Sequence, residues 1–589
     1  KEFQKVFQKS KESAFIMKKQ TKLVAVLSTA ALLAIGASMT SFAATGWAEE
    51  DGTWVYYDRN GDKVTDKWAK SGNNWYYLDS DGEMAVDQLI EDGDNYYYVD
   101  VNGVMAANQW VAIDNEDAGQ DDEPEHYWYY FQANGKALKQ GDNTNVALKT
   151  INGKKYAFDD EGKMLYGWVT ADNAERIDDS DGDAFKEGDY YFGGEDDGAM
   201  TTGWLLMDIT YDEATSDYEI APAFNDDEDQ SRWFYFKSNG KKVYSSSTDE
   251  TKDKTINGKK YTFDQYGAMV AEWSLDKAKA SSSLGEATVN SVEKTGSNAQ
   301  YSQSWRYFNS VEDGSRVSKG WFKVVPAEYL NQDKYNDDED AWYYADGSGN
   351  LYAGEFKTIK GKKYAFRNDG RMINGLKFIR KDADGLTVKA DDDDVYNFDT
   401  EDDFIDNAIG YYLANDFNCY YFGGDEDGAM KTNKTNITID GDNFNFYFEK
   451  SGSNKGAGLT GEKDDKYYLA GMLVKAGSDE KYQVVKKVTL SNGKVAYQKL
   501  DDAKAFLDEV AHTDALSGKE GTTKVTIGDV TKKAEDLKEA YSVTTPSSNY
   551  FLVNTSGSVV DKKSKSKDGD DYVFVTKKGG QIVGVYVED

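Results

Sequence analysis

Short runs of aromatic residues alternate with polar turns along the first part of the chain. Trp54, Trp75 and Tyr96 each open such a run, and they lie 21 residues apart. The turn glycines that follow the runs keep the same spacing, at Gly61, Gly82 and Gly103. A fixed period of this length is typical of stacked supersecondary units, each too small to bury its own apolar face.

Each unit has the pattern of one β-hairpin and a connector. Aromatic residues beside β-branched residues favour strands. Pairs such as Asn60-Gly61 and Asp81-Gly82 supply the positive φ that tight hairpin turns need. A lone hairpin is marginal in water, so the aromatic faces must be buried between neighbouring hairpins. The pattern predicts an all-β repeat protein, an elongated solenoid of β-hairpins.

A longer period replaces the short one after residue 111. The run from Thr150 to Phe158 recurs from Thr255 and from Thr358, with one change in each copy. Each long unit therefore contains several hairpins. Its polar insertions, 208–229 and 280–302, are expected to be loops on one side of the stack.

The last part of the chain has no tryptophan after Trp342. Strands are predicted near 550–553 and 572–575, and helical apolar spacing predicts amphipathic helices at 500–512 and 530–541. The predicted division of the chain is an upstream segment 1–16, a signal peptide 17–44, regular repeats 45–111, long-period repeats 112–376, degenerate repeats with a small α/β segment 377–545, and C-terminal hairpins 546–589.

A secretory signal is predicted near the N-terminus. Lys18, Lys19 and Lys22 precede an apolar run that ends in Ser41-Phe42-Ala43, which fits a cleavage site after residue 43 or 44. A membrane anchor is the alternative. The serine and threonine residues that interrupt the apolar run favour export, which leaves no membrane span in the mature protein.

Composition excludes several classes of function. The net charge of −36 argues against binding to nucleic acids or to anionic lipid surfaces. A single Cys419 and two histidines, His126 and His512, leave little for a disulfide framework, a metal site or a catalytic triad. The acidic run 178–183 lacks the EF-hand register, so turn chemistry is favoured over calcium. We expect no catalytic residues, metal or cofactor.

The repeat resembles a known family. Gly46-Trp47, a Trp-Tyr-Tyr run, a turn glycine and then Met84 are similar to the choline-binding, cell-wall-binding repeats of Gram-positive surface proteins. The runs that begin at Thr150 and Thr255 look like the glucan-binding variants of the same superfamily. The resemblance implies stacked hairpins that hold a protein on choline of teichoic acids or on a wall or glucan polysaccharide.

The resemblance also implies the binding residues. Aromatic rings enclose a quaternary ammonium by cation–π attraction. One implied cage has Trp47, Trp54 and either Trp68 or Trp75, with Met84 nearby, and a second has Trp68, Trp75 and Tyr96 with Met105. Tyr56, Tyr77 and Tyr97 are expected to pack the core. Further aromatic candidates in the later repeats, including positions for sugar stacking, are Trp110, Trp168, Trp204, Trp321 and Trp342.

Three functional hypotheses follow from these patterns. The first is a secreted, non-catalytic, cell-wall-associated binding protein. The second is a structural, adhesin-like surface protein whose repeats form a scaffold, or else a glucan-binding protein. The third is a peptidoglycan hydrolase that uses the C-terminal part. The sequence leaves open the choice between choline and a glucan, and whether the repeats pair two copies into a homodimer.

Overall fold

The computed structural model describes residues 45–589 apart from 121, 142–143, 211–228, 247–250, 286–297, 390–397, 399, 414–415, 425, 440, 491–492 and 520–522. The chain forms two compact units. The first runs to Ala278 and includes Tyr307–Arg316, and the second consists of Lys279–Arg306 and Val317–Asp589. Strands dominate the described residues of both units, as the sequence predicts.

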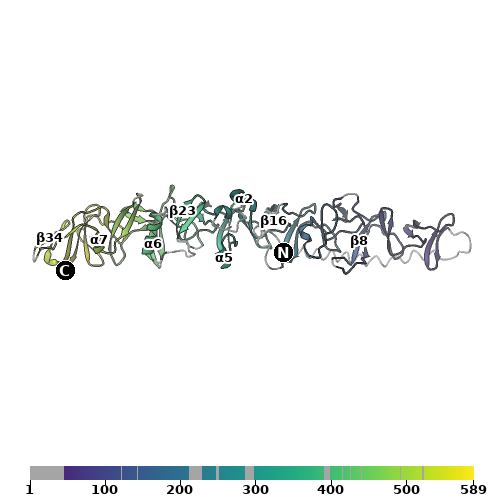
Figure 1. Cartoon of the computed structure of the whole chain (residues 1–589), viewed down its shortest axis with the longest axis horizontal. Helices are drawn as coiled ribbons and strands as arrows, with labels where there is room; N and C mark the ends of the chain where they lie inside the picture. The colour runs from purple at the N-terminus through teal and green to yellow at the C-terminus, as the bar shows by residue number, and fades with distance from the viewer. Residues whose placement is uncertain are drawn as a thin grey trace. The chain divides into compact units, whose positions relative to one another are not determined.

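The first unit is a succession of two-stranded antiparallel hairpins (Figure 1). Its elements are β1 Gly46–Glu50, β2 Thr53–Tyr57, β3 Lys67–Ser71, β4 Asn74–Leu78, β5 Gln88–Asp92, β6 Asn95–Val99, β7 Gln109–Asp114, β8 His126–Phe131, β9 Lys149–Ile151, β10 Lys154–Tyr156, β11 Trp168–Val169, the 3-10 helix η2 Ala184–Lys186, β12 Tyr190–Tyr191, β13 Gly203–Ile209, β14 Gln230–Phe236, β15 Lys252–Ile256, β16 Lys259–Phe263 and β17 Glu272–Leu275. Helix α2 Lys277–Leu284 and strand β18 Trp305–Phe308 each run from one unit into the other.

Two turns alternate in each short repeat. The strands β1 and β2 are joined at Asp51-Gly52, where φ is 51° and 87°. The pair Asn60-Gly61, predicted to join the strands, instead forms the turn after β2, and Gly61 has a φ of 82°. There, the side chain of Asp58 accepts hydrogen bonds from the backbone N–H groups of Asn60 and Asp62, at 2.8 and 3.0 Å. The positive φ was predicted correctly, but it serves the second turn.

A contact between successive hairpins recurs along the chain. The residue two positions after each turn glycine packs on the turn glycine of the next hairpin, where a side chain would not fit. A Cβ atom at Gly103 would lie 2.8 Å from Met84 Cε, and one at Gly314 would lie 2.1 Å from Met269 Cε. The same contact joins Met105 to Gly135, Met164 to Gly198, Met200 to Gly240, Met372 to Gly428 and Met430 to Gly456. We call this contact the Met–Gly step.

The second unit combines hairpins with larger sheets. Its elements are α4 Ala299–Ser302, β19 Gly320–Val324, α5 Gln332–Asn336, β20 Ala341–Ala345, β21 Glu355–Ile359, β22 Lys362–Phe366, β23 Leu376–Asp382, β24 Gly385–Lys389, α6 Glu401–Ala408, the π-helix η4 Ile409–Leu413, β25 Asn418–Tyr421, β26 Asn433–Ile439, β27 Asp442–Phe448, β28 Gly461–Lys463, β29 Lys466–Leu469, β30 Met472–Leu473, β31 Tyr482–Thr489, β32 Val495–Lys499, α7 Ala503–Glu509, β33 His512–Asp514, β34 Lys524–Ile527, β35 Val530–Lys533, the 3-10 helix η5 Ala534–Asp536, β36 Leu537–Val543, β37 Tyr550–Asn554, β38 Ser566–Lys567, β39 Tyr572–Thr576 and β40 Ile582–Glu588.

The C-terminal strands belong to sheets that begin well before residue 546. Strand β37 pairs with β31, and β40 lies between β36 and β39 in a five-stranded sheet ordered β33-β36-β40-β39-β38. Another five-stranded sheet is ordered β26-β27-β30-β29-β28. The strand pairing therefore crosses the predicted division at 545, so 546–589 is not a separate set of hairpins.

Two predictions about helices and loops need correction. The helix predicted at 500–512 is present as α7, but the one predicted at 530–541 is wrong, because β35, η5 and the start of β36 occupy that segment. The insertion 280–302 is not a plain loop, since α2 and α4 occupy its two described ends. Most of the other predicted loop, 208–229, lies outside the described residues.

Candidate functional site

Among the residues that the structure describes, five hairpins carry two tryptophans on the same face with at least one of the two partly exposed; the two tryptophans of the β17–β18 hairpin, Trp273 and Trp305, are both buried. In the β1–β2 hairpin, Trp47 pairs with Tyr56 and Glu49 pairs with Trp54, so both indoles project from one face. We call such a pair a Trp corner. The corners, in chain order, are Trp47 and Trp54 (corner 1), Trp68 and Trp75 (corner 2), Trp110 and Trp128 (corner 3), Trp204 and Trp233 (corner 4), and Trp321 and Trp342 (corner 5).

A tyrosine of the following hairpin adds a third ring to each corner. Its ring meets the first tryptophan of the corner at a steep angle and at centroid distances between 4.8 and 5.2 Å. The pairs are Trp47–Tyr76, Trp68–Tyr97, Trp110–Tyr156, Trp204–Tyr261 and Trp321–Tyr364. Each first tryptophan therefore lies between the tyrosine of its own hairpin and that of the next.

A methionine is fixed against the second tryptophan of every corner. The backbone N–H of Met84 donates to the carbonyl of Trp54 at 2.7 Å, and that of Met269 donates to the carbonyl of Trp233 at 2.7 Å. The equivalent bonds join Met105 to Trp75, Met164 to Trp128 and Met372 to Trp342. A polarizable thioether suits the floor of a site with aromatic walls.

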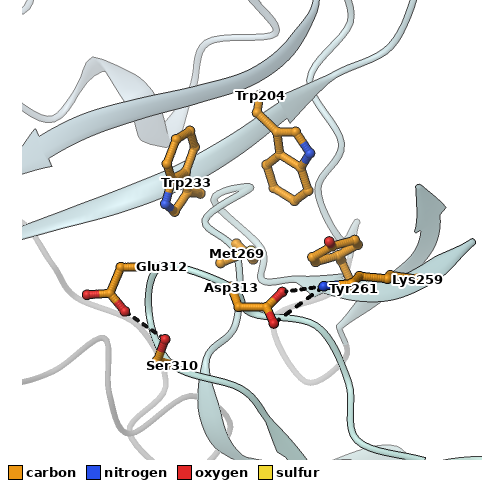
Figure 2. A pocket seen from close by; sticks show the side chains of 8 residues that line it. All are labelled: Trp204, Trp233, Lys259, Tyr261, Met269, Ser310, Glu312 and Asp313. Carbon is orange, nitrogen blue, oxygen red and sulfur yellow. Dashed lines mark hydrogen bonds and ion pairs between the residues drawn. The ribbon is translucent and has the colours of Figure 1, made fainter. Parts of the chain in front are cut away.

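Corner 4 opens into a cavity of about 340 Å³, within the size range of small-molecule sites. The centroids of its two indoles lie 6.2 Å apart, and their planes meet at 86°. Figure 2 shows these indoles across the space from Glu312 and Asp313, with Met269 between them. In corner 5 the indoles have almost the same arrangement, 6.4 Å apart at 84°.

Two perpendicular indoles select the shape of a ligand. A rounded cationic headgroup placed in the corner can contact both ring faces at once, with about 0.5–2 kcal/mol from each cation–π contact. A flat pyranose ring can stack on only one of the two faces. In corners 3 to 5 the third ring stays neutral, because burial raises the pKa of Tyr156 to about 12 and also raises the pKa of Tyr261 and Tyr364.

The structure changes which ring completes the two predicted cages. Tyr76, and neither Trp68 nor Trp75, meets Trp47 in corner 1. In corner 2 the third ring is Tyr97, where Tyr96 was predicted. Tyr96 instead packs in a cluster with Leu89 of its own hairpin, and the leucine in place of a first tryptophan leaves that hairpin without a corner. Met84 and Met105 take the predicted places.

Two tyrosines predicted to be core residues, Tyr56 and Tyr77, are half-buried and pack on the first tryptophan of their own hairpin. The third, Tyr97, is the corner residue described above.

Among the later candidates, Trp110, Trp204, Trp321 and Trp342 belong to corners, but Trp168 does not. Trp168 is 1% exposed, and the ammonium of Lys242 lies 5.0 Å from its ring centroid. This position is therefore filled by the amine of Lys242 from the chain itself. The prediction missed Trp128 and Trp233, although each opens an aromatic run that matches Trp54 and Trp75.

Other chemistry is sparse among the residues that the structure describes. No group of three or more His, Cys, Asp and Glu side chains is arranged to hold a metal ion there. In the acidic run 178–183, Asp178 accepts the backbone N–H of Ser180 at 2.9 Å and Asp179 that of Ala184 at 3.0 Å, which is turn chemistry. None of the described helices has the length and apolar character needed to cross a membrane.

Comparison with known proteins shows that the short repeat is similar to the choline-binding repeat. The family model described as "Choline-binding repeat" matches residues 44–79 and 64–110, which contain corners 1 and 2. A 280-residue stretch is 25% identical to Glucosyltransferase-S of Streptococcus mutans serotype c and covers 42% of this chain. The chain spans only 16% of the length of that relative.

Solved structures with similar parts come from Streptococcus pneumoniae. The modular autolysin LytC, in complex with a synthetic peptidoglycan ligand, is 19% identical over 57% of this chain and 54% of its own, with a TM-score of 0.28. Choline binding protein F is 17% identical over 74% of this chain and all of its own, with a TM-score of 0.20. The choline binding domain of Spr1274 is 30% identical over 16% of this chain and 95% of its own, with a TM-score of 0.12.

Proposed function

We propose that this chain, whose residues 44–110 are choline-binding repeats, is a secreted, non-catalytic protein that attaches to the bacterial cell wall through its Trp corners. The ligand of each corner is a quaternary ammonium headgroup, such as the choline that decorates teichoic acids. The observation that supports this most is the pair of perpendicular indoles in corners 4 and 5, which offer two ring faces to one rounded cation.

The recurrence of the corners supports a multivalent anchor. The Met–Gly step and the bond from each methionine N–H to a tryptophan carbonyl repeat from one hairpin to the next, which favours a solenoid. Several weak sites on one stack raise the effective concentration of the remaining sites once the first has bound. A polymer with repeated choline groups would therefore be held far more tightly than free choline.

Binding to an α-glucan is the second candidate. It is favoured by the stretch of 280 residues that is similar to Glucosyltransferase-S. Acidic side chains beside aromatic rings, as in corner 4, can also accept hydrogen bonds from sugar hydroxyl groups.

Titration of the full chain by tryptophan fluorescence, with choline and with dextran in parallel, tests both candidates. Ten of the 13 tryptophans belong to corners, and Trp168, Trp273 and Trp305 are buried. We expect a saturable change at millimolar choline and release of the protein from a choline-bearing matrix by free choline. A response to dextran alone would assign the corners to a glucan, and no response to either would refute both candidates.

A further inference from the structure

Each Trp corner meets a turn from the hairpin after next, because the glycine of that turn packs on the methionine of the corner. We call the two residues before this glycine the rim of the corner. The rims are Val101-Asn102 at corner 1, Ala133-Asn134 at corner 2, Asp196-Asp197 at corner 3, Glu312-Asp313 at corner 4 and Glu426-Asp427 at corner 5. Corners 3 to 5 thus have an acidic rim, and corners 1 and 2 have a neutral one.

In corners 3 and 5 a rim carboxylate contacts the second tryptophan directly. The indole N–H of Trp128 donates to Asp196 Oδ1 at 3.2 Å, and that of Trp342 donates to Glu426 Oε2 at 2.6 Å. The carboxylate therefore lies at the edge of the ring, the positive part of its quadrupole, and the negative face stays available for a cation. Hydrogen bonds from Trp342 and then Lys323 lower the pKa of Glu426, so this group is ionised at neutral pH.

In corner 4 the rim faces the open cavity (Figure 2). The hydroxyl of Ser310 donates to Glu312 Oε2 at 2.6 Å and lowers the pKa of this exposed carboxyl. The ammonium of Lys259 lies 3.1 Å from Asp313 Oδ1, so the charge of Asp313 is already matched. Among the residues that the structure describes, Glu312 is therefore the acidic group of this cavity that forms no ion pair.

Charges carried by the strands vary from corner to corner. Glu49 lies across from Trp54 in corner 1, and the ammonium of Lys70 lies 5.6 Å from the Trp75 centroid in corner 2. The equivalent strand positions are Ala112 in corner 3, Leu206 in corner 4 and Lys323 in corner 5. An acidic rim is thus the feature that corners 3 to 5 share, whatever their strands carry.

We propose that Glu312, the first rim residue of corner 4, is the counter-ion of the bound ammonium group, so that this corner binds cations by ion pairing as well as by cation–π contact; in corners 3 and 5 the equivalent carboxylates already face His126 at 3.3 Å and Lys323 at 3.1 Å. This inference rests on the proposed function and deepens it. Corners 1 and 2 have no rim charge, so any salt dependence of their cation affinity comes from the strand charges Glu49 and Lys70 alone. Corner 4 therefore discriminates a cation from a neutral group of the same shape and loses affinity as salt screens the charge of Glu312.

The test uses the full chain labelled with 5-fluorotryptophan, so that ¹⁹F NMR follows each corner separately. The signals of Trp233 and Trp54 are assigned by their loss in W233F and W54F. Choline is titrated at ionic strengths of about 0.05 M and about 0.5 M, where screening differs strongly. The neutral analogue 3,3-dimethylbutan-1-ol, with a tert-butyl group in place of trimethylammonium, is the second probe.

We expect Glu312→Gln to weaken choline binding at Trp233 about fivefold to tenfold at low salt and to remove most of its salt dependence. Binding of the neutral analogue should not change. Glutamine keeps the acceptor for Ser310, and the side chain is exposed, so the fold should be retained. Glu116→Gln removes the same charge from an exposed loop position outside the rims and should change nothing at Trp233.

The reciprocal variant adds a charge to a neutral rim. Val101 is 69% exposed, so V101E should be tolerated, and it should give the Trp54 signal a salt-dependent gain in choline affinity. If E312Q leaves choline affinity at Trp233 unchanged at both ionic strengths while all corners still bind, the counter-ion inference is wrong and the proposed function survives. If no tryptophan signal responds to choline in the unmodified chain, both are overturned.

Discussion

Replacing Trp233 by alanine separates the binding role of a corner from its packing role. Trp233 lines the cavity of corner 4. Its partner Trp204 also packs on Tyr235 at 5.1 Å and on Tyr261 at 4.8 Å. W233A should therefore remove ligand contact with little loss of fold, and W204A should remove both.

The structure sets the size of the two effects. W233A deletes one cation–π contact of about 0.5–2 kcal/mol, which corresponds to roughly twofold to 30-fold weaker choline binding at this corner. W204A removes a half-buried indole that contacts several rings, so the free energy of unfolding should fall by about 3 kcal/mol, the lower end for Trp→Ala in a core. Its ligand affinity should fall by at least as much as in W233A.

The assay is choline titration of the labelled full chain by ¹⁹F NMR, with the Trp204 signal as the reporter for W233A. Urea unfolding measures the stability of each variant. Tyr335→Ala is the matched control, because it deletes an aromatic ring that is 45% exposed and belongs to no corner. Undiminished choline affinity at Trp204 in a folded W233A protein would refute the assignment of corner 4 as a binding site.

Three further predictions concern packing and charge. Gly314→Ala should lower the free energy of unfolding by about 2–4 kcal/mol in urea titrations, because it combines a φ of 56° with a clash against Met269. The control Gly258→Ala has a φ of 82° but open space around it, so it should lower the free energy of unfolding by only about 1–2 kcal/mol. Equal losses in the two variants would contradict the Met–Gly step. Burial lowers the pKa of Lys242 to about 7, so the native state holds fewer protons than the unfolded state above that pH. The free energy of unfolding should therefore rise by up to about 2–3 kcal/mol between pH 7 and 9. A rise of the same size in K242M would count against this account. Cys419 is 1% exposed, and burial raises the pKa of its thiol well above the ordinary value. A disulfide reagent at pH 8 should therefore label this thiol only as fast as the second unit opens. Immediate labelling of the native protein would contradict this.

The sequence period predicted the hairpins well because each hairpin is specified locally. Aromatic and β-branched residues favour strands, and glycines at fixed offsets permit positive φ. The period could not say which ring of a Trp-Tyr-Tyr run faces the preceding hairpin, since that depends on the rotation between hairpins. The middle tyrosine, Tyr76 or Tyr97, takes this place, whereas Trp75 stays on the face of its own hairpin and is 40% exposed.

The wrong helix at 530–541 has a specific cause. Leu537 and Ala540 are buried three residues apart, a spacing typical of a helix. In the structure both lie on strand β36, and a register shift between Leu537 and Glu539 accounts for the extra residue. A β-bulge changes the alternation of a strand by one residue, so that a local pattern cannot distinguish it from one helical turn.

The Met–Gly step explains how hairpin stacking can continue where tryptophan ends. Beyond Trp342, the side chain of Met430 still packs on Gly456, Leu473 on Gly557 and Val559 on Gly580. The step needs only a glycine without a side chain and a long or branched apolar residue that fills the space. Stacking through this step therefore does not require a tryptophan. Under the proposed function, a hairpin without its tryptophans would keep its place in the stack and lose its binding site, so that the Trp corners, and not the extent of the repeat, would set the number of sites.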